Sequence, residues 1–286
     1  MDKNNFVSVD PQQLRDLARG WAREAAGLIQ SRRAELSDGG DIRDHTKTKS
    51  TQVDPVTIVD MAAEEFIVGA IRSMRPDDGI IGEEGTNRAS TSGVSWVIDP
   101  IDGTVNFIYG IPQYAVSVAA AVDGHVVAGA VINVVSGDLY SAAAGAGATV
   151  ERSGKTIELK ANPVEDLRLA LVSTGFAYTP TRRAHQGAIV AQLLGTVRDI
   201  RRMGAAALDL CAVAEGRVDA YYEHGINSWD YAAGSLIASE AGAVVVTPPL
   251  TALGAEGNRT LACAPGIATE FLTLLEELGG AGTLPA

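Results

Sequence analysis

Residues 96–104 read Trp96-Val97-Ile98-Asp99-Pro100-Ile101-Asp102-Gly103-Thr104. Here an apolar strand ends in two aspartates that are three residues apart. Pro100 rules out a regular helix through the segment, because an interior proline removes a backbone donor and clashes with the preceding turn. Two carboxylates at the end of a buried strand repel each other strongly unless they are neutralised. The stretch therefore indicates a cation site, or else a local structural role in which Asp102 caps a helix starting at Gly103.

Other acidic residues follow short apolar strands or begin helices. Glu83 and Glu84 follow Ile80-Ile81, Asp230 begins a helix after Trp229, and Asp60 lies at another helix start. Each one alone is most often a cap or a solvated chain end. Together, without matching basic partners, they resemble oxygen ligands for hard cations such as Mg²⁺. Two such cations a few ångströms apart suit in-line attack of water on a phosphate.

Zinc and nucleotide motifs are poorly matched. The four histidines lack metal-ligand spacing, which argues against zinc, and we expect each at the surface: His45, His125, His185 and His224. Ser153-Gly154-Lys155-Thr156 resembles the end of a P-loop, but Thr149 stands where the earlier glycine is required. We interpret Ser153-Gly154 as a hairpin turn.

Two helix starts could bind an anion. Residues 103–106 would offer backbone N–H groups to a phosphate. Gly204-Ala205-Ala206 begins a second helix after Arg201-Arg202, and its small residues allow a ligand to approach closely. A tight packing corner explains the second segment nearly as well.

The wider pattern predicts a layered α/β sandwich. Two amphipathic helices, the first capped by Asp10 before Pro11 and the second ending before Pro76, enclose a polar segment, 36–54, expected to be a mobile loop. A largely antiparallel meander follows, with a hairpin turn at Asp123-Gly124. Strands and helices then alternate. We expect residues 1–162 to form the helices and the antiparallel sheet with most metal ligands. Residues 163–286 would form an α/β half that completes the site within one structural unit.

Composition limits the partners and the compartment. The 286 residues carry a formal net charge of -12, which disfavours binding to nucleic acid and to anionic membranes. The N-terminal segment lacks the apolar region of a secretion signal, and no apolar run reaches membrane-spanning length. Cys211 and Cys263 lie in apolar runs and read as buried thiols. We expect a soluble cytoplasmic protein.

Four sequence blocks resemble one known family. Asp99-Pro-Ile-Asp102-Gly-Thr104-Val-Asn106-Phe107 is similar to the signature of inositol monophosphatases. Ile81-Gly82-Glu83-Glu84, Trp229-Asp230-Tyr-Ala-Ala-Gly234 and Asp54-Pro-Val-Thr57-x-x-Asp60 resemble the other blocks, in the family's order. The resemblance spans residues 49–234, and four ordered blocks are far more specific than any one.

The resemblance implies a role for each matched residue. Glu83, Asp99 and the carbonyl of Ile101 would bind a first metal, and Asp99, Asp102 and Asp230 a second, with Glu83 also reaching a weaker third ion. Thr104 and Asp60 would orient and deprotonate the attacking water, and Gly103 and Thr104 would hold the phosphate. Lys49 matches a lysine near the site. The alcohol of the substrate would face Arg201, Gly204, Ala205, Ala206 and Glu223, beside Asp230.

The family also implies a five-layer αβαβα sandwich, two Mg²⁺ ions with a third weaker one, a homodimer and inhibition by lithium. Ala205 and Val105 each replace a threonine that is common in the family, which bears on the substrate more than on the reaction. The expected reaction is hydrolysis of inositol monophosphate to inositol and phosphate.

Two alternatives stay open at this stage. A sister phosphatase would act on histidinol phosphate, fructose 1,6-bisphosphate or a nucleotide 3′-phosphate. Glu223 suits hydroxyl donors and would repel an anionic nucleotide, but it would also attract a cationic amine. The other class is a regulatory role, since some bacterial members of the family bind the transcription machinery.

Overall fold

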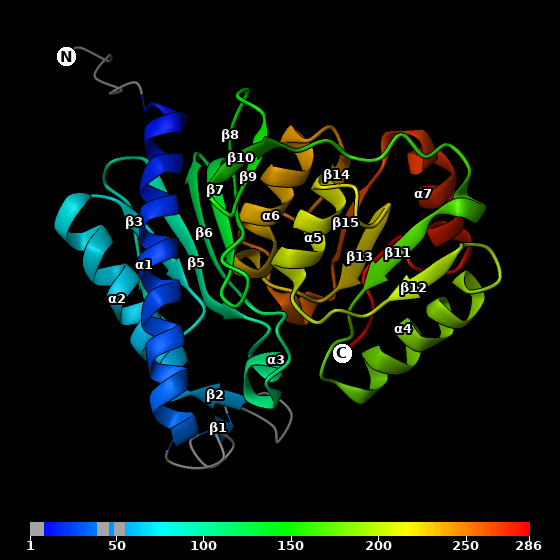
Figure 1. Cartoon of the computed structure of the whole chain (residues 1–286). Helices are drawn as coiled ribbons and strands as arrows, with labels where there is room; N and C mark the ends of the chain where they lie inside the picture. Colours follow the sequence, from blue (N-terminus) through cyan, green and yellow to red (C-terminus); the bar gives the residue numbers. More distant parts are fainter. Residues whose placement is uncertain (1–8, 39–45, 49–54) are drawn as a thin grey trace.

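The computed structural model describes residues 9–38, 46–48 and 55–286 (Figure 1). Lys49, Asp54 and His45 lie outside these residues. The helices are α1 (Pro11–Asp38), α2 (Ile58–Met74), α3 (Thr104–Tyr109), α4 (Pro180–Leu193), α5 (Ala206–Ala214), α6 (Ser228–Glu240) and α7 (Ala268–Glu277). The strands are β1 (Thr46–Thr48), β2 (Pro55–Thr57), β3 (Gly79–Gly82), β4 (Asn87–Arg88), β5 (Val94–Asp102), β6 (Ala115–Val122), β7 (His125–Asn133), β8 (Leu139–Ala143), β9 (Ala148–Arg152), β10 (Lys155–Glu158), β11 (Leu171–Thr174), β12 (Asp199–Arg201), β13 (Ala220–His224), β14 (Val244–Val246) and β15 (Arg259–Cys263).

The elements stack in five layers, as the family resemblance implies. Helices α1 and α2 cover one face of an eight-stranded sheet, and α5 and α6 lie between that sheet and a five-stranded one (Figure 1). Helices α4 and α7 cover the outer face of the second sheet. The order αβαβα confirms the expected fold class.

Three apolar clusters fill the spaces between the layers. In β5, Trp96 and Ile98 pack in the cluster with α1 and α2, while Val97 packs in the cluster with α5 and α6. In β13, Tyr221 joins the central cluster and Tyr222 joins the cluster with α4 and α7. Successive strand residues point to opposite faces, so strands that are apolar at every position belong between two helical layers.

The first sheet has the order β10-β9-β8-β7-β6-β5-β3-β4, and only the β3–β5 pair in it is parallel. The second has the order β12-β11-β13-β15-β14, with β11 parallel to both β12 and β13. The expected division near Asn162 falls between the sheets. Because α5 and α6 from the second half also pack against the first sheet, we propose that both halves form one structural unit.

A bulge in β5 places the two aspartates. Asp99 pairs with Ser117 of β6 and Asp102 pairs with Ala115, so β5 has one more residue than β6 between these positions. Residues three apart normally face opposite sides of a strand. One extra residue brings them to the same side. The bulge contains Pro100, which cannot donate to the ladder.

Several local predictions are confirmed. Asp10 accepts a hydrogen bond from the backbone N–H of Gln12 at 2.9 Å, and α1 begins at Pro11. The turns at Asp123-Gly124 and Ser153-Gly154 join antiparallel strands with positive φ at every central residue (51° and 78°, 50° and 74°). That backbone conformation suits the twist of a hairpin.

One burial prediction is wrong. His224 is fully buried in β13, where its ring contacts Tyr222 and its Nε2 lies 3.1 Å from the carbonyl oxygen of Gly280. Its place on a strand between two helical layers decides its burial. Cys211 and Cys263 are buried free thiols, as expected. Within the described residues, no helix is both long and apolar enough to cross a membrane.

Candidate active site

Three carboxylates meet at one point between the first sheet and the central helices. Asp99 and Asp102 come from the end of β5, and Asp230 comes from the first turn of α6. One oxygen of each lies within 4.8 Å of the others. The β5 bulge and the start of α6 thus assemble a group of ligand atoms from positions about 130 residues apart in the chain.

The electrostatics of this cluster favour a bound cation. Burial raises the pKa of Asp99 well above its usual range, and the charges of Glu83, Asp102 and Asp230 raise it further. Burial is also the largest cause of the raised pKa values of Asp102 and Asp230. Asp99 Oδ1 is buried without a hydrogen-bond partner. Buried like charges of this kind need a proton or a cation, and an all-oxygen ligand set suits a hard cation such as Mg²⁺.

Asp102 has a second contact that fixes its orientation. Its Oδ1 accepts a hydrogen bond from the N–H of Ala206 at 3.1 Å, and its Oδ2 accepts one from Ala207 at 2.7 Å. The cap position of α3 is Gly103, which provides no side-chain bond. Asp102 therefore caps α5 and not the helix that follows it, so the local-cap alternative is wrong. It also occupies the N–H of Ala206.

The other ligand candidates are held in a similar way. Asp230 Oδ2 accepts the backbone N–H of Asn227 at 2.6 Å, and the carbonyl of Ile101 accepts the Thr104 hydroxyl at 3.0 Å. Each acceptor group keeps further lone pairs. Glu83 lies close enough for its charge to raise the pKa of Asp99. These residues fit the donor set of a cation site.

A cavity of about 950 Å³ opens beside the carboxylates. Eleven residues predicted from the sequence line it: Glu83, Asp99, Ile101, Asp102, Gly103, Thr104, Gly204, Ala205, Ala206, Glu223 and Asp230. Asp60 does not line it. It lies buried in the first turn of α2. Lys49 is outside the described residues.

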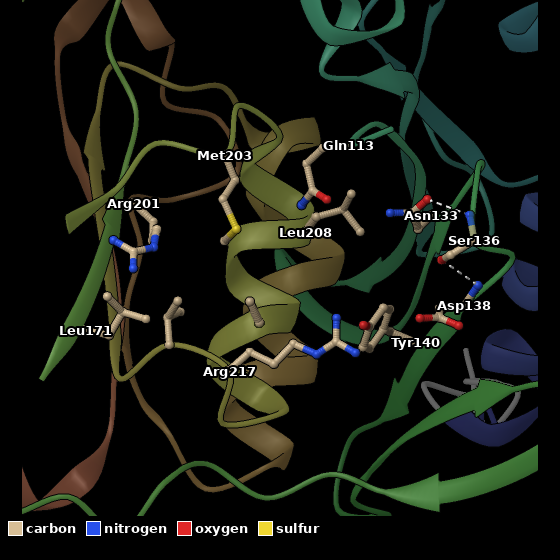
Figure 2. Close-up of a pocket in the computed structure, with 12 residues that line it drawn as sticks. Gln113, Asn133, Ser136, Asp138, Tyr140, Leu171, Arg201, Met203, Leu208 and Arg217 are labelled. Atoms are coloured by element: carbon tan, nitrogen blue, oxygen red, sulfur yellow. Dashed lines mark hydrogen bonds between the residues drawn. The ribbon is translucent and has the colours of Figure 1, made fainter. Parts of the chain in front are cut away.

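Arg201 lies elsewhere. It lines a separate cavity of about 290 Å³ with Met203 and Arg217 (Figure 2), and its Nη1 donates to Asp199 at 2.6 Å. The acidic cavity is lined by the next residue, Arg202. Neighbouring residues at the end of a strand point to opposite sides, so a prediction that is off by one position moves a side chain to another cavity.

The two segments that face the substrate region are fastened together. Asn106 Nδ2 donates to the carbonyls of Gln113 at 2.7 Å and Met203 at 2.8 Å. Gly103 has φ of 92°, and a Cβ there would lie only 3.0 Å from the Gln113 carbonyl and 3.1 Å from that of Gly204. Glycine is required at 103 both by its backbone conformation and by this close approach.

Sequence reasoning missed three residues near the site. Arg202 was passed over for its neighbour. Asp209 of α5 lines the acidic cavity, but it stands in an otherwise apolar helix. Glu64 accepts hydrogen bonds from the N–H groups of Glu84 and Thr86, beside the metal-ligand candidate Glu83. A usable signal was present, because a charged residue on the buried face of an apolar helix requires a partner.

Comparison with known proteins agrees with the geometry. The sequence profile described as the inositol monophosphatase family matches residues 10–278. The chain belongs to the inositol monophosphatase family. The inositol-1-monophosphatase of Mycobacterium leprae is 50% identical over 283 residues, which cover 95% of this chain and 96% of that protein. The solved structure of Mycobacterium tuberculosis SuhB is 44% identical and has a TM-score of 0.82, covering 95% of this chain and 99% of that one.

A further relative of this chain has a different name. The protein named Nus factor SuhB of Pasteurella multocida is 40% identical over 245 residues, which cover 84% of this chain and 90% of that protein. The relatives of this chain therefore include proteins named for a phosphatase and proteins named as a Nus factor.

Proposed function

We propose that this member of the inositol monophosphatase family hydrolyses inositol monophosphate to inositol and phosphate, with Mg²⁺ as its cofactor. One observation carries the proposal: the carboxylate cluster Asp99–Asp102–Asp230 and the carboxyl group of Glu223 line the same cavity. The first suits cations and phosphate, and the second suits a hydroxyl-bearing alcohol. Similarity to proteins named inositol-1-monophosphatase supports the same substrate.

The chain would hold two cations, with a third bound more weakly. Glu83, Asp99 and the Ile101 carbonyl would bind one, and Asp99, Asp102 and Asp230 the other. When bound, the cations would neutralise the phosphate and lower the pKa of the attacking water. The backbone of Gly103 and Thr104 lies at the start of α3, where N–H groups can contact phosphate oxygens.

Thr104 and Asp60 would orient and deprotonate the attacking water. In the structure the Thr104 hydroxyl donates to the Ile101 carbonyl, so the oxygen of that hydroxyl remains able to accept a hydrogen bond. Asp60 is buried in the first turn of α2. We propose that the Thr104 hydroxyl turns from the Ile101 carbonyl to donate to Asp60 while its oxygen accepts a hydrogen bond from the water. Thr104 would then pass its own proton to Asp60 as it takes one from the water.

Glu223 would bind the alcohol part. It is 9% exposed, and its Oε2 accepts the hydroxyl of Tyr221 at 2.8 Å. None of the described hydrogen bonds uses Glu223 as a helix cap. Its other oxygen can therefore accept a hydrogen bond from a polyol, and hydrogen bonds to charged groups contribute about 1.5–3 kcal/mol.

A comparison of two substrates tests the proposal. We expect Mg²⁺-dependent phosphate release from inositol monophosphate and from glycerol 2-phosphate, with a higher kcat/KM for the former. Glu223→Gln should lower kcat/KM for inositol phosphate by about ten- to a hundredfold and change that for glycerol 2-phosphate much less. Equal losses on both substrates would remove the case for inositol phosphate.

The panel should also include the sister substrates. Histidinol phosphate carries an amine that the carboxyl groups of this cavity would attract, while fructose 1,6-bisphosphate and nucleotide 3′-phosphates bring extra negative charge. If the wild-type kcat/KM is highest for one of these compounds, that compound replaces inositol phosphate as the proposed substrate.

A protein-binding role is the second candidate, since a 40% identical relative is named a Nus factor. Purified RNA polymerase should then be retained by the immobilised chain and by its Asp99→Asn variant alike, because binding would not need catalysis. No retention by either protein would remove this candidate.

The family resemblance also leads us to propose a cytoplasmic homodimer that lithium inhibits. Light scattering of the purified chain measures its mass against the monomer's 29.7 kDa. A lithium titration at fixed Mg²⁺ measures inhibition of phosphate release. A measured mass of one chain would contradict the homodimer. Full activity in lithium would contradict inhibition by lithium.

A further inference from the structure

One carboxyl group that lines the large cavity is not used by the proposed reaction. Asp209 lies in the first turn of α5, is 1% exposed and lines the cavity together with Glu223. Its Oδ1 has no hydrogen-bond partner. Buried carboxyl oxygens are almost always paired, so a buried oxygen without a partner requires an explanation.

Few buried groups share this property. Among the described residues that line the cavity, only Asp99 and Asp209 have a buried side-chain oxygen without a partner. Asp99 belongs to the cation cluster. Asp209 lies near Glu223, the group proposed to bind the alcohol, since the charge of Glu223 raises the pKa of Asp209.

The fold does not use the unpaired oxygen of Asp209. The first turn of α5 is capped by Asp102, and no ion pair of Asp209 occurs among the described residues. Burial raises the pKa of Asp209 well above its usual range, and the charge of Glu223 raises it further, while Ser173 and Arg202 oppose the shift. Keeping the group there therefore costs stability.

Asp209 and Glu223 together form a pair of acceptors from two elements, α5 and β13. Burial also raises the pKa of Glu223, whereas the Tyr221 hydroxyl and Arg202 lower it. Two adjacent carboxyl groups can accept hydrogen bonds from two neighbouring hydroxyls of one ring. They disfavour a second phosphate group at this end of the substrate.

We propose that Asp209 is a second substrate-binding residue, whose Oδ1 accepts a hydrogen bond from a ring hydroxyl next to the one that Glu223 binds. This inference rests on the proposed function. It narrows the substrate to the phosphate monoester of a cyclic polyol with at least two free hydroxyls on the side away from the phosphate. A ring hydroxyl of such a substrate would donate the hydrogen bond that Asp209 Oδ1 lacks.

The test combines Asp209→Asn and Asp209→Ala with inositol phosphates that each lack one hydroxyl. Asp209→Ala should lower kcat/KM for inositol phosphate by about ten- to a hundredfold, and Asp209→Asn by less, because the amide keeps a neutral acceptor. The inhibition constant of free inositol should rise by a similar factor, because inositol would bind more weakly. Activity on glycerol 2-phosphate should change less than about threefold, which also shows that the variants are folded.

A substrate–enzyme cycle identifies the contact. The analogue that lacks the hydroxyl bound by Asp209 should have the same kcat/KM with wild type and with Asp209→Ala. A different analogue, which lacks the hydroxyl bound by Glu223, should have the same kcat/KM with wild type and with Glu223→Gln. Thr260→Val is the matched control, because Thr260 is a buried residue whose hydroxyl lacks a partner and which does not line the cavity. It should leave the ratio between the two substrates unchanged.

The outcomes separate the two proposals. If wild type does not prefer inositol phosphate to glycerol 2-phosphate, the proposed substrate fails and the role of Asp209 fails with it. If wild type shows the preference and both Asp209 variants keep it, only the role of Asp209 is overturned. An equal loss on every substrate would also overturn it, since that indicates a structural role.

Discussion

Asp102 Oδ2 accepts a hydrogen bond from the backbone N–H of Ala207 at 2.7 Å, across 105 residues of sequence. One side chain therefore ties the end of β5 to the first turn of α5 and also faces the carboxylate cluster. A negative charge at the N-terminal end of a helix is stabilising. The same charge is available to a cation, so Asp102 links the stability of the central layer to the proposed chemistry.

Replacing Asp102 should separate these two roles. We expect Asp102→Asn to lose at least about a hundredfold in kcat, because the cations lose a charged ligand. The metal-free variant should have a Tm close to that of wild type, because relief of the like-charge repulsion offsets the loss of one of the two acceptors at the start of α5. Asp102→Ala loses both acceptors and should be about 1–2 kcal/mol less stable than Asp102→Asn. Phosphate release and calorimetry measure these effects, and a fully active Asp102→Asn enzyme would contradict the two-cation site.

The proposed water relay makes a kinetic prediction. Thr104→Ala and Asp60→Asn should each lower kcat and leave KM nearly unchanged, because both residues act on the nucleophile. The double variant should be little slower than the slower single variant. If the two losses multiply in steady-state kinetics, the residues do not share one proton path.

Glu64 should position the loop that carries Glu83. Its Oε2 accepts the N–H of Glu84 at 2.7 Å and its Oε1 that of Thr86 at 3.2 Å. A Cβ at Gly82 would lie 2.6 Å from Oε2, so the carboxyl group packs directly against this loop. Outer contacts of this kind contribute about ten- to a hundredfold to metal affinity.

We therefore expect Glu64→Ala to raise the half-saturating Mg²⁺ concentration by about tenfold, with the maximal rate largely restored at saturating Mg²⁺. Glu64→Gln should lie between wild type and Glu64→Ala. Glu65→Ala, an exposed neighbour on α2, is the control and should have no effect. A Mg²⁺ titration that Glu64→Ala does not shift would overturn the positioning role.

His224 should make the protein less stable in mild acid. Burial lowers the pKa of His224 to about 4, while its hydrogen bond to Gly280 opposes the shift and Arg259 and Arg182 add to it. The unfolded chain, with an ordinary pKa near 6.5, then binds the proton more readily. This group therefore leaves stability unchanged above about pH 6.5 and decreases it as the pH falls from there towards 4. Between pH 7 and pH 5 the loss is about 2 kcal/mol.

Urea unfolding at these two pH values measures the effect of His224. In His224→Leu the pH-dependent loss should be smaller by that amount, because the hydrogen bond to the Gly280 carbonyl that the change removes costs the same at either pH, and Arg259 Nη1 still donates to that oxygen at 3.3 Å. His185→Leu, which removes an exposed histidine, should behave as wild type. An unchanged pH dependence in His224→Leu would show that His224 binds a proton as readily in the folded protein as in the unfolded chain, and would contradict a lowered pKa.

Local structure could be predicted from the sequence. The hairpin turns at Asp123-Gly124 and Ser153-Gly154, the cap at Asp10 and the end of α2 before Pro76 follow from the conformations open to these residues and their neighbours. The acidic residues at strand ends and helix starts were also apparent. Each depends on a few consecutive residues, so no tertiary contact was needed to predict it.

Tertiary structure decided what these residues do. A bulge at Pro100 brings Asp99 and Asp102 to one side of β5, and Asp102 caps α5 and not α3. Burial between two helical layers decides the state of His224, and the side to which a strand end points places Arg202 in the acidic cavity in place of Arg201. The physical reason is that propensities and turn geometry act within one or two turns of chain. Burial, like-charge repulsion and unpaired oxygens such as that of Asp209 arise only when distant segments pack together.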